Sequence, residues 1–227
     1  MVDLHSHILP QVDDGSRSVE ETMQMLSLLA SQGVETVVAT PHFYAWKDTM
    51  EAFLSRRQTA YSQLPEDNAL PKICLGAEVT YFAGISRSEE LKKLQLGQTK
   101  LLLIEMPFDD WTDRMVAEIC DLPIQTGLQP VLAHVDRYRH RSQMGKYSQV
   151  LLSHNVYFQC NADAFSRGAK SHWALKQIAL GNIHFLGSDC HNLTHRPPLL
   201  ADATEKIRKK LSEEALDRIT LLEKQYF

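Results

Sequence analysis

The sequence predicts an α/β protein built on a parallel sheet, and three observations lead to this fold class. Short apolar runs typical of buried strands recur seven times along the 227-residue chain. Stretches with helical periodicity separate them, and strict alternation of strands and helices implies parallel strands. Hydrophobic residues make up 44% of the chain, with no internal repeat or long linker. We therefore expect a single domain over residues 1–227.

The predicted strands cover residues 1–4, 36–39, 73–79, 101–105, 130–134, 156–161 and 183–187. The first helix has the clearest signals, because Ser18 and Glu21 form an S-x-x-E capping box and Gly33 suits a helix end. Further helices are expected over residues 49–64, 88–94, 113–122, 146–154, 173–180 and 202–222. The alternation of strands and helices fits either a closed barrel or an open doubly wound sheet. Seven units are one fewer than in the usual eight-stranded barrel.

Composition indicates which kinds of partner and which cellular compartment to expect. The net charge of −4 brings no basic surplus, so we expect no nucleic-acid partner. No apolar run reaches the ~20 residues of a membrane helix. Met1 leads straight into Val-Asp-Leu-His without a signal peptide, and the four cysteines form no C-x-x-C pair, so a cytoplasmic protein with reduced thiols is expected. The sequence leaves open whether the chain forms a homo-oligomer.

Polar residues stand where most of the predicted strands end. They are His5 and His7, His42, Glu78, Glu105, His134, and Asp189 with His191. In an α/β barrel all these strand ends meet on one face, so residues far apart in the sequence converge there. Imidazole and carboxylate groups bind zinc, iron and manganese, and a set rich in carboxylates without an obvious thiolate favours manganese or iron. The pattern therefore predicts a metal-dependent hydrolase.

Several longer segments match a known family in order along the chain. They are Asp3-Leu4-His5-Ser6-His7-Ile8-Leu9-Pro10, Asp13-Asp14-Gly15, Ala39-Thr40-Pro41-His42, Gly76-Ala77-Glu78, Leu103-Ile104-Glu105-Met106-Pro107-Phe108, residues 130–138, and Ser188-Asp189-Cys190-His191-Asn192. The chain resembles the PHP (polymerase and histidinol phosphatase) superfamily. More closely, it resembles the manganese-dependent protein-tyrosine phosphatases of Gram-positive capsular and exopolysaccharide operons, the CpsB/YwqE type.

This resemblance implies a distorted (β/α)7 barrel of PHP type with a cluster of up to three divalent ions. Manganese is the expected metal, with iron and zinc as alternatives. Carried over by position, His5, His7, Glu78 and Asp189 would bind the first ion. Glu78 would also bind the second ion, together with Glu105 and His134. Asp14, His42 and His191 would bind the third. Arg137 and Arg196 match the phosphate-binding arginines of the family.

The resulting hypothesis is a metal-dependent protein-tyrosine phosphatase. Three divalent ions would outweigh the four carboxylate ligands, and a net positive centre suits a phosphoryl group. We expect a metal-bridging hydroxide to attack phosphorus while Arg137 and Arg196 stabilise the phosphoryl oxygens, with His42 a candidate for assisting the leaving group. No cysteine is followed by an arginine six positions later, which argues against a thiol nucleophile. The expected substrate, the phosphotyrosine tail of a bacterial tyrosine kinase, follows from the resemblance alone.

Two other functions stay open on the sequence. One is a small-molecule phosphatase such as histidinol phosphatase, which a comparison of histidinol phosphate with a phosphopeptide would distinguish. The other is a non-catalytic metal-binding module that docks a partner, although the near-complete set of ligands argues against it. The Asp109-Asp110-Trp111 segment has no role that the sequence assigns.

Overall fold

The computed structural model describes residues 1–166 and 168–227, with Gln143 described in its backbone alone. Its strands form two parallel sheets. The smaller has the order β1-β2-β4, with β1 at Val2–Ser6, β2 at Thr36–Ala39 and β4 at Lys72–Leu75. The larger has the order β3-β5-β6-β7-β8-β9. Its strands are His42–Phe43, Glu78–Thr80, Leu101–Glu105, Gln129–Leu132, Tyr157–Asn161 and Phe185–Gly187.

The two sheets are parts of one curled sheet. β3 continues β2 after Pro41, and β5 continues β4 after a break at Gly76 and Ala77. A parallel bridge between Ser6 and Cys190 joins β1 to the end of β9, and His7 N donates to the Cys190 carbonyl at 2.9 Å. The strand order follows the chain without the reversal that a doubly wound sheet requires. The structure therefore confirms the predicted α/β class as a distorted barrel of seven parallel units.

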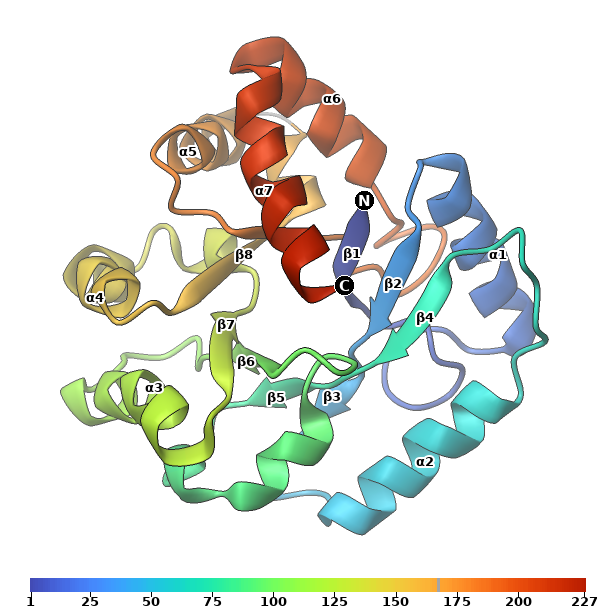
Figure 1. The fold of residues 1–227 in the computed structure, drawn as a ribbon, viewed down its shortest axis with the longest axis horizontal. Coiled ribbons are helices and arrows are strands. Elements are labelled where there is room, and N and C mark those ends of the chain that lie inside the picture. Colours follow the sequence, from blue (N-terminus) through green and yellow to red (C-terminus); the bar gives the residue numbers. More distant parts are fainter. Residues whose placement is uncertain (167) are drawn as a thin grey trace.

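Helices surround the strands on the outside (Figure 1). They are α1 Val19–Ser31, α2 Met50–Ser62, α3 Asp113–Thr126, α4 Ser142–Ser153, α5 Gly168–Ala179, α6 Leu200–Lys210 and α7 Glu213–Tyr226. The residues predicted to begin and end α1 do so in the structure. Ser18 Oγ accepts from Glu21 N at 3.2 Å, while the Glu21 carboxylate caps the backbone of Arg17 instead of Ser18. Gly33, at φ +78°, ends the helix with a bond from its N–H to the Ala30 carbonyl.

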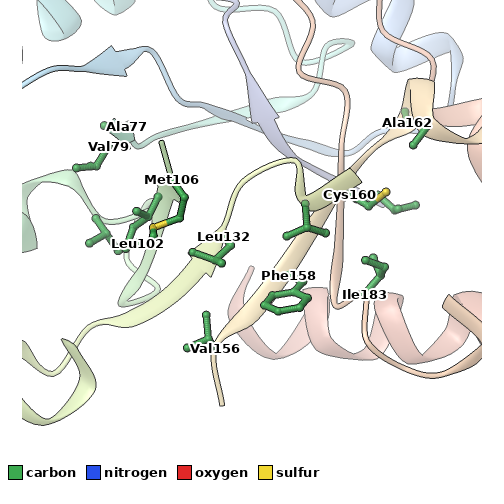
Figure 2. Close-up of a cluster of buried hydrophobic side chains, with 14 of the residues drawn as sticks. Ala77, Val79, Leu102, Met106, Leu132, Val156, Phe158, Cys160, Ala162 and Ile183 are labelled. Carbon is green, nitrogen blue, oxygen red and sulfur yellow. The ribbon is translucent and has the colours of Figure 1, made fainter. Parts of the chain in front are cut away.

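Apolar side chains pack in two layers, one on each side of the strands. The outer layer lies between strands and helices, and Figure 2 shows part of it around Leu132, Phe158 and Ile183. The inner layer fills the end of the barrel at which the strands begin. Its members are Val2, Leu4, Val38, Leu96, Leu101, Leu103, Val131, Ala133 and Phe185. Leu222, Tyr226 and Phe227 pack against this inner layer from the C-terminal end of the chain. The other end of the barrel is thus the one where a polar site can form.

The helix predicted over residues 202–222 is wrong as one element, because the structure has α6 and α7 there. Leu211, at φ −118° and ψ −90°, leaves the helical region, and Ser212 is extended at φ −172° and ψ 168° before α7 begins. Serine followed by two glutamates is a helix start that the sequence contains. The segment over residues 88–94 forms a 3₁₀ helix, Glu89–Leu94, and the predicted strand 73–79 is interrupted at Gly76.

The two ends of the chain lie together at the closed end of the barrel (Figure 1). Glu223 of α7 is buried and accepts a hydrogen bond from Val2 N at 3.0 Å. The C-terminal helix therefore holds the strand that carries His5 and leads into His7. Among the helices described here, none has the length and apolar character needed to span a bilayer.

Candidate metal centre and active site

A bulge in β1 directs His5 and His7 into the barrel. Asp3 pairs with Val37 and Ser6 pairs with Ala39, so β1 has one residue more than β2 across this interval. Val2 and Leu4 point into the inner core, and the extra residue shifts the alternation so that His5 and His7 point inward as well. Both side chains are fully buried. Strand β1 thus changes from apolar packing to a polar site within a few residues.

Three of the predicted histidine ligands present the same nitrogen to the centre. His5 Nδ1 lies 3.2 Å from Gln159 Oε1, His7 Nδ1 lies 2.6 Å from Asp13 Oδ2, and His191 Nδ1 lies 3.0 Å from the Asp189 carbonyl. Each of these oxygens is an acceptor, which places the imidazole proton on Nδ1 and leaves the lone pair on Nε2. An imidazole held in this way is ready to bind a metal ion through Nε2.

The ligand atoms of the first predicted ion have spacings that fit a bound cation. His5 Nε2 and His7 Nε2 lie 3.1 Å apart, each lies 3.3 Å from Glu78 Oε2, and each lies 3.6 Å from Asp189 Oδ1. Metal bonds of about 2.1 Å to nitrogen and oxygen separate neighbouring ligand atoms by roughly 3.0–3.4 Å. Two imidazole nitrogens at this distance need a proton or a metal ion between them, because two facing lone pairs repel. The residues therefore fit a divalent ion at this point.

The other predicted ligands adjoin this group. His134 Nε2 lies 2.8 Å from Glu78 Oε1 and 3.4 Å from Glu105 Oε1. Asp14 Oδ1 lies 3.6 Å from His42 Nε2 and 3.5 Å from His191 Nε2. His42 Nδ1 approaches Glu78 Oε2 to 3.0 Å without hydrogen-bond geometry, as two ligands of one ion would. The structure thus brings every residue predicted to bind metal into one continuous cluster.

The grouping of these side chains differs from the sequence prediction in two places. His7 lies within reach of Asp14, His42 and His191, the three residues assigned to the third ion. His42 lies within reach of Glu78 and Glu105, which were assigned to the second ion. Both histidines stand between neighbouring groups, because the His7 and His42 rings lie 4.6 Å apart at the centre of the cluster. Position in the sequence does not determine which of two adjacent ions such a side chain approaches.

The buried carboxylates give the centre a strong affinity for positive charge. Burial lowers the pKa of His7, but the carboxylates of Asp13 and Glu78 outweigh it and raise the pKa to about 10. Burial likewise opposes the charge of His134, while Glu105 and Glu78 raise its pKa to about 9. Protons are held tightly here because negative charge is concentrated out of contact with water. A divalent cation would satisfy the same carboxylates and displace those protons.

Two of the predicted ligands occupy strained backbone positions. His134 has φ +33° and Asp189 has φ +52°, in the left-handed region that residues other than glycine rarely adopt. Gln159 Oε1 accepts from His134 N at 2.6 Å, and Asp189 N donates to the His5 carbonyl at 2.7 Å. These buried hydrogen bonds maintain the two conformations. They aim the side chains at the centre from the ends of β7 and β9.

The predicted phosphate-binding arginines lie at the edge of the cluster. Arg137 Nη2 pairs with Asp189 Oδ2, and Arg196 Nη2 lies 2.6 Å from Asp189 Oδ1. Arg196 Nη1 also contacts His191 Nε2 at 2.7 Å. About a third of each arginine side chain is exposed, so both guanidinium groups connect the buried ligands with solvent. A phosphoryl group that enters the centre would meet both of them.

Sequence reasoning missed three residues that support the cluster. Asp13 binds His7 Nδ1 and also accepts from His42 N at 2.9 Å. Asp3 accepts from Ser188 N at 2.7 Å and so ties β1 to the segment after β9. Gln159 binds both His5 and His134. A signal existed for Gln159, because a glutamine inside an apolar strand two residues before Asn161 places two amides on the inner face.

Comparisons with known proteins agree with this geometry. Residues 1–226 match the family model described as capsular polysaccharide synthesis, CpsB/CapC. The tyrosine-protein phosphatase CpsB of Streptococcus pneumoniae is 30% identical over 225 residues, which cover 92% of this chain and 90% of the relative. Tyrosine-protein phosphatase YwqE of Bacillus subtilis is 27% identical, with 94% and 86% of the two chains covered.

A solved structure gives the same result for the fold. It comes from the work on YwqE from Bacillus subtilis and CpsB from Streptococcus pneumoniae, described as metal-dependent tyrosine phosphatases. It superimposes with a TM-score of 0.84 at 25% identity, over 97% of this chain and 91% of the solved one. The expected PHP-type fold is therefore confirmed. The chain belongs to the CpsB/CapC family.

Proposed function

We propose that this chain is a metal-dependent protein-tyrosine phosphatase that hydrolyses phosphotyrosine in a protein of capsular or exopolysaccharide synthesis. The observation that carries the proposal is the cluster itself, in which the Nε2 atoms of His5 and His7 lie 3.1 Å apart and each lies 3.3–3.6 Å from carboxylate oxygens of Glu78 and Asp189. The membership in the CpsB/CapC family and the names of the relatives supply the substrate class.

The predicted ligands fit divalent ions by donor type, spacing and tautomer. We propose manganese as the metal, with up to three ions bound by the residues assigned above. Bound there, such ions would lower the pKa of water and neutralise negative charge on a phosphoryl group. A cysteine nucleophile is not part of the proposal, because burial raises the pKa of all four thiols, those of the fully buried Cys160 and Cys190 and those of the partly exposed Cys74 and Cys120.

The side chains around the ligands have separate tasks. Gln159 and Asp13 fix the tautomers of His5 and His7, so that both Nε2 atoms point at one place. Arg137 and Arg196 are positioned to donate to phosphoryl oxygens and to exchange their contacts with Asp189 for contacts with the substrate. The His42 side chain is 14% exposed and lies beside the exposed Asp14 at the edge of the centre, which suits a role in protonating the leaving phenolate.

The same proposal includes one domain over residues 1–227, since strands from β1 to β9 contribute to one centre. It also includes the phosphotyrosine tail of a bacterial tyrosine kinase as the substrate and the cytoplasm as the location. A phosphorylated peptide from such a tail, incubated with the manganese-loaded protein, tests the activity directly. Release of phosphate that EDTA abolishes is expected. A preference for histidinol phosphate by orders of magnitude would contradict the choice of substrate.

A further inference from the structure

Exposed aromatic side chains lie beside the metal centre on two neighbouring loops. Trp46, 65% exposed, follows β3, and Phe108, 42% exposed, follows β6. In the sheet, β5 lies between β3 and β6 and carries Glu78. The two loops therefore stand on either side of the carboxylate to which both His42 and His134 are directed.

Phe108 covers the outer side of His134. The two rings are nearly parallel, at 11°, with centroids 6.1 Å apart. Two hydrogen bonds fix the backbone before Phe108. Tyr138 Oη donates to the Met106 carbonyl at 2.7 Å, and Trp111 Nε1 donates to the Pro107 carbonyl at 2.8 Å. Trp111 is buried, so the Asp109-Asp110-Trp111 segment anchors a fixed position for Phe108.

Tyr44 and Trp46 form the matching surface on the other side. The Tyr44 ring stacks on His42 at 24° with centroids 5.3 Å apart, and the Trp46 ring lies 5.2 Å beyond Tyr44. The turn is fixed by the N–H groups of Lys47 and Asp48, which donate to the Tyr44 carbonyl at 2.9 and 3.0 Å. A charge-assisted pair between Asp48 and Arg56, at 2.9 and 3.1 Å, anchors its end.

We propose that Tyr44, Trp46 and Phe108 form an aromatic subsite that binds the ring of an aryl phosphate and makes the chain selective for aryl over alkyl esters. The proposal rests on the proposed function. Arg137 follows β7 and Arg196 follows β9; both contact Asp189, and Arg196 also contacts His191. A phosphoryl group bound by these arginines therefore lies on the β7 and β9 side of the centre. The organic group then extends toward β3 and β6, where the aromatic side chains stand. Exposed aromatic surface of this kind is typical of a binding site.

Preorganised loops make the subsite effective, because little freedom is lost when a ring binds to it. A phenyl ring stacked on one aromatic side chain binds roughly 2.3- to 13-fold more tightly than the same ligand without that contact. Two such contacts, with Phe108 and with Trp46, would give at least roughly fivefold selectivity for an aryl group. Alkyl phosphates would bind to the same ions and arginines without this gain.

The test uses two phosphonates that cannot be hydrolysed, so leaving-group chemistry does not enter. Calorimetry of the manganese-loaded protein measures the Kd of phenylphosphonate and of methylphosphonate. Wild type should bind the phenyl compound at least roughly fivefold more tightly. The double variant Trp46→Ala, Phe108→Ala should bring the two Kd values together by weakening phenylphosphonate alone. Both side chains are exposed, so an unchanged Tm checks that the variant is folded.

Ile124→Ala on α3 is the control, because Ile124 is 83% exposed on a helix that supplies no ligand. It should leave both Kd values as in wild type. Selectivity that persists in the double variant, or an equal loss of affinity for both compounds, would overturn the aromatic subsite. Turnover of p-nitrophenyl phosphate on the same preparation tests the proposed function separately. An inactive protein that still prefers phenylphosphonate would refute the function and keep the subsite.

Discussion

Gln159→Leu should weaken metal binding although Gln159 is not among the predicted ligands. The side chain is fully buried, and its Oε1 lies 3.2 Å from His5 Nδ1 and 2.6 Å from His134 N. Its Nε2 donates to Asn161 Oδ1 at 3.0 Å, and Asn161 in turn donates to Asp189 Oδ2 at 2.7 Å. One amide thus orients three predicted ligands. Leucine has a similar volume but none of these hydrogen-bonding groups.

The size of the effect follows from the bonds that are lost. The buried N–H of His134 would have no acceptor, which costs about 1–3 kcal/mol, and His5 could rotate away from its present tautomer and orientation. Loss of a partner that orients a metal-binding histidine typically reduces metal affinity by roughly 10- to 100-fold. That factor corresponds to about 1.4–2.8 kcal/mol of metal-binding free energy, separate from the cost in folding stability.

Calorimetric titration of the metal-free protein with Mn²⁺ measures this change. Gln177→Leu is the matched control, since it removes the 2.8 Å bond between Gln177 and Asn182 away from the cluster. The control should keep wild-type Mn²⁺ affinity, and Gln159→Leu should lose at least roughly tenfold. If both variants bind Mn²⁺ as wild type does, the reasoning from tautomer and orientation is refuted, whatever happens to Tm.

Three further outcomes are expected. In Gly187→Ala, the added Cβ would lie 2.6 Å from His5 Cβ. We expect this clash to cost about 1–3 kcal/mol of stability in chemical denaturation and to weaken Mn²⁺ binding. A variant as stable as wild type would show that β9 has room to move. Arg137→Ala should keep its metal in elemental analysis while KM rises and kcat falls, and wild-type kinetics would remove the phosphate role of Arg137. Burial raises the pKa of Glu223 to about 7 from 4.5, so the folded state favours the protonated carboxyl. Its contribution to stability is then complete below pH 4.5 and declines as the pH rises through about 7. The free energy of unfolding of Glu223→Gln should therefore rise relative to that of wild type between pH 5 and pH 8, by up to about 3 kcal/mol. A difference that does not depend on pH would contradict the raised pKa.

The sequence predicted the strands well, because apolar runs and helical periodicity reflect which faces are buried. It also predicted that His5, His7, Glu78 and Asp189 converge, since the ends of parallel strands share one face. These inferences depend on patterns that repeat along the chain. They do not depend on the packing of any single residue.

Other features depend on contacts between distant segments and left a weaker trace in the sequence. The bulge in β1 appears only in its register with β2. Asp13 and Asp14 are adjacent, and only the fold determines that Asp13 binds His7 Nδ1 while Asp14 faces His42 and His191. Gly187 shows no signal of its own, because its role is the space it leaves for His5. The Ser212 start of α7 was visible, but the helical pattern around it was stronger.

Phosphotyrosine hydrolysis should depend on divalent ions bound to the His, Asp and Glu cluster. The most direct test removes metal with EDTA, measures residual metal by elemental analysis, and assays a phosphotyrosine peptide while Mn²⁺ is restored stepwise. Activity should fall with metal content and return in proportion to the Mn²⁺ bound, and His7→Ala should recover neither. Full turnover of the peptide by metal-free protein would contradict this dependence.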